Sequence, residues 1–188
     1  MATGKATMKR LLRRVIVAAG AIALPTSAHA QIVVVLPSTS LSTTLTATVS
    51  EQARVAVPAG VLFSVGDIGA STAASAASVT IDQIVLATTT KQLRISLQAG
   101  AASFTPSIGG SPTWAAGDVS WNAATWTQAA GSAGTLSASS YATVATCTAG
   151  VSSCATSQLV FTLAPNTAIT NAGNHTLSVT WKIESIGS

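Results

Sequence analysis

The chain has 188 residues and a formal net charge of +4, and only 7% of its residues are charged. Five of its nine Lys and Arg residues precede Gln31, and from Gln31 onward four cations and five acids leave a charge of −1. Because nucleic-acid binders carry a positive surface, this balance excludes DNA and RNA as predicted partners of everything after the N-terminal segment.

Residues 1–30 have the pattern of a secretory signal peptide. Basic residues are followed by an apolar run over residues 15–24 and then by Ala28-His29-Ala30, which fits an A-x-A cleavage site. The run is too short for a membrane anchor, which takes about 20 residues. The sequence therefore predicts cleavage before Gln31 and one mature domain over residues 31–188, secreted to the cell surface, the exterior or the periplasm.

The predicted mature chain opens with an apolar segment, Ile32, Val33, Val34 and Val35, which ends at Pro37. A strand that is apolar on both faces must be covered on both. Two interpretations stay open. The segment is either a first strand inside its own domain or a donor strand that completes a sheet of a neighbouring subunit by β-augmentation.

Alternation of apolar and polar residues predicts most of the remaining elements. The clearest case is residues 177–184, where Leu177, Val179, Trp181 and Ile183 alternate with polar residues. Turn-forming Gly, Pro and Asn residues separate the segments, and no helical period is sustained. These signals predict an all-β chain, an immunoglobulin-like antiparallel β-sandwich. The other predicted strands are residues 45–50, 54–57, 78–84, 93–98, 118–121, 141–146 and 158–163.

Cys147 and Cys154 are the only cysteines in the chain. An exported protein meets an oxidising compartment, so these two residues are predicted to form a disulfide that closes one hairpin. A zinc site or a redox pair is not favoured, because the residues after Gln31 include one histidine, His175, and the cysteine spacing is not C-x-x-C.

Three tryptophans, Trp114, Trp121 and Trp126, lie in the least regular part of the chain, residues 99–140. With three Phe and one Tyr in the whole chain, they are needed for core volume. Exposed indole rings would instead stack on sugars. Trp121 is assigned to the core, and Trp114 and Trp126 are kept as a candidate ligand patch.

The sequence has no catalytic signature. It contains no G-x-S-x-G, G-x-G-x-x-G or P-loop pattern, and its acids are scattered. Asp67, Asp82 and Asp118 could bind calcium, but they do not follow the spacing of an EF-hand. The predictions are therefore no enzyme activity, no cofactor and no metal.

Residues 159–166, LVFTLAPN, and residues 172–181, AGNHTLSVTW, resemble the last hairpin of secreted bacterial pilin-like proteins, including the spore coat U family. The resemblance covers about the last thirty residues and implies an immunoglobulin-like sandwich in a surface or fibre subunit. The chain departs from that pattern in two ways: it has no cysteine in its early strands, and His175 stands where the relatives usually carry Tyr.

These observations predict a non-catalytic secreted subunit of a surface, matrix or fibre that self-associates through its N-terminal strand. Its partners would be copies of itself or other envelope and surface proteins. The alternative is a secreted module that binds a carbohydrate or a receptor, with polysaccharide as the partner and the tryptophan patch as the site.

Overall fold

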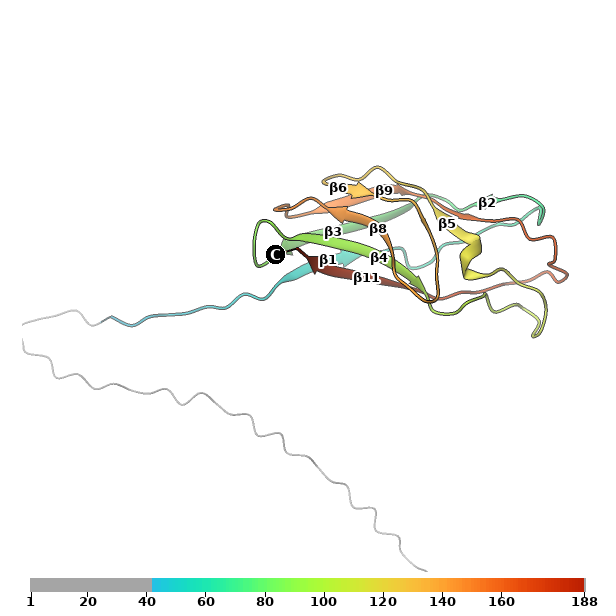
Figure 1. Ribbon diagram of the computed structural model, residues 1–188, viewed down its shortest axis with the longest axis horizontal. Coiled ribbons are helices and arrows are strands. Elements are labelled where there is room, and N and C mark those ends of the chain that lie inside the picture. Colours follow the sequence, from blue (N-terminus) through green and yellow to red (C-terminus); the bar gives the residue numbers. More distant parts are fainter. Residues whose placement is uncertain (1–41, 188) are drawn as a thin grey trace, which may run out of the picture. The chain divides into compact units, whose positions relative to one another are not determined.

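The computed structural model describes residues 42–187 (Figure 1). The predicted signal peptide and the segment Ile32, Val33, Val34 and Val35 lie outside the described residues. The chain divides into two units, Met1–Thr46 and Ala47–Ser188. Of the first unit, residues 42–46 are described, and they are exposed and form no strand. No helix in residues 42–187 has the length and apolar character needed to cross a membrane.

The second unit is all-β, as predicted, apart from the short 3-10 helix η1 (Ala116–Asp118). Its strands are β1 (Gln52–Ala56), β2 (Thr72–Ala73), β3 (Ala77–Val85), β4 (Gln92–Ala99), β5 (Val119–Trp121), β6 (Ala129–Gly131), β7 (Gly134–Thr135), β8 (Ala142–Cys147), β9 (Cys154–Leu159), β10 (Phe161–Leu163) and β11 (Val179–Ile186).

The strands form three antiparallel sheets with the orders β1-β3-β9, β2-β10-β5-β7 and β11-β4-β8-β6. Only Val160 separates β9 from β10, so one run of chain passes from the first sheet into the second. The Asn122 side chain supports this passage, because its Oδ1 accepts a hydrogen bond of 2.8 Å from the Val160 N–H. The longest ladder joins β11 to β4, from Val179 opposite Ala99 to Ile186 opposite Gln92.

The core is built by the alternating strands. In β4, Leu93, Ile95 and Leu97 are buried, as the period of two predicts. In β3 the alternation shifts, because Ile81 and Ile84 are both buried although they are three residues apart. Gln83 lies between them with φ 52°, a left-handed conformation, and the pairing with β1 shifts register there. This extra residue is a β-bulge that turns Ile84 back toward the core.

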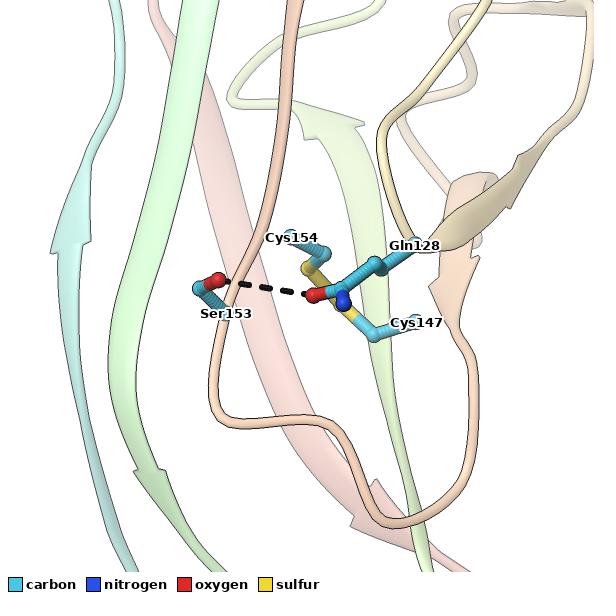
Figure 2. The surroundings of a disulfide bond; sticks show 4 residues. All are labelled: Gln128, Cys147, Ser153 and Cys154. Carbon is cyan, nitrogen blue, oxygen red and sulfur yellow. Dashed lines mark hydrogen bonds between the residues drawn. A yellow bond between two sulfur atoms is a disulfide. The ribbon is translucent and has the colours of Figure 1, made fainter.

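On one side of the unit, a continuous stretch of chain connects two of the sheets. Residues 129–135 run from β6 in one sheet to β7 in another, with only residues 132 and 133 between them. Beside this crossing, the Cys147–Cys154 disulfide joins β8 to β9 and therefore links two different sheets (Figure 2). The predicted disulfide is confirmed, but the loop that it closes is not the predicted hairpin, because β8 and β9 do not pair and belong to different sheets.

The strand predicted over residues 45–50 is not formed. Residues 42–51 contain no strand, and the Leu45 side chain is 92% exposed. Alternation supplies an amphipathic face, but a strand also needs a hydrogen-bonded neighbour, and this segment has none in the described structure. The short strands β2, β6 and β7 were not predicted, because two or three residues carry too little periodic signal.

Candidate functional site

An apolar groove with a cavity volume of about 1150 Å³ opens beside β11. Two stretches of chain form its walls: residues 57–63, which follow β1, and residues 169–179, which lead into β11. Its other lining residues come from the loops and from the core: Val65, Ile68, Phe104, Trp114, Val119, Leu136, Phe161, Leu163 and Trp181.

The bottom of the groove is the hydrophobic core itself. Val119, Leu136, Phe161 and Leu163 are buried core residues that line it. Large apolar side chains on the walls are exposed, and Leu62 is 78% exposed. Contiguous apolar surface that continues into a core marks an interaction site in a soluble protein. The other exposed apolar residues that line the groove are Val57, Val61, Ile68 and Val179.

The groove also borders a sheet edge. Among the described strands, β11 pairs only with β4, so its other edge has no strand partner. On the opposite wall, β1 ends at Ala56, and no strand forms again until β2 at Thr72. An open strand edge presents unpaired N–H and C=O groups, which is the usual template for adding a strand. The groove thus combines an apolar floor with a backbone edge.

The polar groups at one end of the groove are bonded to the protein. Trp114 Nε1 donates a hydrogen bond of 2.9 Å to the Ala164 carbonyl. The His175 ring stands edge-on to the Trp114 ring, with 5.2 Å between their centroids, and His175 Nδ1 lies 2.8 Å from the Thr113 hydroxyl. Trp114 Nε1 and His175 Nδ1 are therefore engaged within the protein, while Asn174 and Thr176 add polar groups to the lining.

The structure places the predicted site residues apart. Trp114 and Trp126, the candidate ligand patch, are 5% and 8% exposed and belong to the core, and only Trp114 lines the groove. Stacking on a sugar would require their rings to be uncovered first, and the patch stays a prediction. Trp126 Nε1 is buried without a hydrogen-bond partner in the described structure. Cys147 and Cys154 are not among the groove residues.

The aspartates considered for calcium have local roles. Asp67 Oδ1 accepts a hydrogen bond of 2.8 Å from the Gly69 N–H, and Asp118 Oδ2 accepts one of 2.7 Å from the Ala115 N–H. Asp82 forms an ion pair with Arg54, at 2.7 Å. Within residues 42–187, no group of three His, Cys, Asp or Glu side chains is placed to hold a metal ion.

Ion pairs fasten the beginning of β1. Glu51 Oε1 lies 2.8 Å from Lys91 Nζ and accepts a hydrogen bond of 2.7 Å from the Ala87 N–H. The Lys91 ammonium, and after it the Ala87 N–H, hold the pKa of Glu51 below its ordinary value. The Arg54 guanidinium likewise lowers the pKa of Asp82. Their ion pair joins β1 to β3. The contacts of Glu51, the residue before β1, join it to the loop between β3 and β4.

Comparison of the chain with protein-family models, with curated proteins and with solved structures finds no significant match. The resemblance to pilin-like and spore coat U proteins stays a prediction.

Proposed function

We propose that the chain is a non-catalytic, secreted subunit of a surface layer, matrix or fibre, which associates with copies of itself through its N-terminal strand. The observation that carries this proposal is the groove, in which an exposed apolar surface continues into the core beside the unpaired edge of β11. Such a surface is incomplete in an isolated subunit and is stabilised when a strand fills it.

The finer description of the fold is part of the proposal. Because β9 and β10 are consecutive, the sheets β1-β3-β9 and β2-β10-β5-β7 can be treated as one layer. The sheet β11-β4-β8-β6 is then the second layer, and the disulfide joins the two. This arrangement supports an immunoglobulin-like sandwich that is closed at β6 and β7 and open between residues 57–63 and β11.

The segment Ile32, Val33, Val34 and Val35 has the chemistry that the groove requires. It is apolar on both faces, β-branched throughout and followed by Pro37, which ends strand pairing. Inserted beside β11, it would bring apolar side chains to the floor and backbone groups to the open edge. The signal-peptide pattern and the disulfide both support an oxidising location outside the cytoplasm.

Light scattering after size-exclusion chromatography, with negative-stain microscopy, tests this function. The chain that begins at Gln31 should form oligomers or fibres, and a chain that begins at Ser38 should stay folded and monomeric. Val34→Asp should also abolish assembly, because a charge cannot be buried in the apolar groove. Ser38→Asp adds the same charge outside the apolar segment and should leave assembly intact. Monomers from the chain that begins at Gln31 would contradict the proposal.

A further inference from the structure

His175 is the titratable group of the groove. Among the described residues that line the groove, no other has an ionisable side chain. His175 lies on the wall that leads into β11, four residues before Val179, and it is half-buried. Its protonation state therefore decides whether the groove surface carries a charge.

The charged side chains next to the groove in sequence belong to other contacts. Asp67 and Asp118 each accept a hydrogen bond from a backbone N–H, and neither lines the groove. Lys182, which follows the last groove residue, forms an ion pair with Glu184, with 2.5 Å between Nζ and Oε2. Within residues 42–187, therefore, no described contact sets a carboxylate against His175.

Both ring nitrogens of His175 face oxygen atoms. Nδ1 lies 2.8 Å from the Thr113 hydroxyl, and Nε2 lies 3.5 Å from the Asn171 carbonyl oxygen. A carbonyl can only accept, so the neutral ring carries its hydrogen on Nε2 and the Thr113 hydroxyl donates to Nδ1. A second proton on Nδ1 would donate to the same hydroxyl, which rotates to accept it. The ring can therefore become charged where it stands.

Covering the groove makes that charge costly. An imidazole side chain takes up a proton between about pH 8 and about pH 5. In the open groove water solvates the half-buried cation, but an apolar guest displaces this water and supplies no countercharge. Resting on the proposed function, we infer that protonation of His175 makes the groove reject apolar guests, including the strand that joins two subunits. Binding is then favoured at neutral pH and is lost as the pH falls.

The ion pairs of the fold titrate below this interval. Glu51, Asp82 and Glu184 each bond to a cation, which holds the pKa of the carboxyl group below its ordinary value. These carboxylates therefore stay charged down to about pH 5. A change in binding between about pH 7.5 and about pH 5.5 then belongs to His175 and not to a loosening of β1 or β11.

Assembly at two pH values tests the inference. Light scattering measures oligomers of the chain that begins at Gln31 at about pH 7.5 and about pH 5.5, and circular dichroism checks the fold. We expect assembly to require a roughly tenfold higher protein concentration in acid, the size of a typical coupling between two ligands. His175→Phe keeps a ring beside Trp114 and His175→Asn keeps an amide near Thr113, and neither variant should respond to pH. Equal pH responses of all three chains would overturn the inference.

A neutral dye separates this inference from the proposed function. N-phenylnaphthylamine, which carries no charge at either pH, is titrated into the chain from Gln31 with Val34→Asp, whose subunits should stay apart. Its affinity should also fall roughly tenfold in acid, and His175→Phe in this background should abolish the change. A dye response that depends on His175, without assembly of the unaltered chain at either pH, would support the inference and contradict the proposed function. Assembly without a His175-dependent change in either measurement would do the reverse.

Discussion

Gly131→Ala is expected to lower the free energy of unfolding by about 3 kcal/mol, the upper part of the usual range for overpacking a core. A Cβ atom at this position would lie 2.2 Å from the Ala124 carbonyl oxygen and 2.8 Å from Trp126 Cδ1. The first contact is with backbone, which cannot rotate away. The affected chain is the crossing from β6 to β7, so the closed side of the fold should open first.

Urea denaturation of the variant checks this expectation, with Gly109→Ala as the matched control. A Cβ atom at Gly109 meets nothing within 4 Å, so that substitution should change stability by no more than about 0.5 kcal/mol. If both variants were equally stable, Gly131 would not lie against Trp126 and the Ala124 carbonyl.

Removal of the disulfide is expected to cost about 2.5 kcal/mol, the loop-entropy value for a loop of this length. The cysteines are seven positions apart in the sequence, so the loop itself is short. The bond nevertheless joins β8 and β9, which belong to different sheets, and both cysteines are buried. We therefore expect Cys147→Ala with Cys154→Ala to fold and to unfold at a lower denaturant concentration.

The comparison uses chemical denaturation of the double variant and of the unaltered chain, each with and without reductant. Reductant should shift the midpoint of the unaltered chain toward that of the variant and leave the variant unchanged. Equal midpoints for the oxidised chain and the variant would show that the bond contributes no stability.

The regular part of the fold could be predicted because apolar and polar residues alternate with a period of two, although no residue of β11 is fully buried. Residues 93–98 and 177–184 alternate, and they became most of β4 and part of β11. The shift in β3 could not be predicted in this way, because the left-handed conformation of Gln83 depends on its pairing with β1. The segment 45–50 shows the converse, since it alternates and yet has no strand beside it.

The groove could not be read from the sequence. Its two walls, residues 57–63 and 169–179, are more than a hundred residues apart and meet only through the order of the sheets. Pro58 and Gly60 favour a turn, and Val61 and Leu62, in the apolar run that follows, are too exposed for a core strand. That run was the available signal, and its meaning depends on the unpaired edge of β11.

Binding of a peptide to the open groove is the first measurement of whether residues 31–37 fit it. The chain from Ser38 is titrated with a fluorescent peptide of residues 31–37, and the same peptide with Val34→Asp serves as the control. We expect saturable binding of the first peptide and a melting temperature of the protein that rises with peptide concentration, because a ligand of the native state stabilises it. A folded chain that binds neither peptide and shows no change in melting temperature would contradict the account.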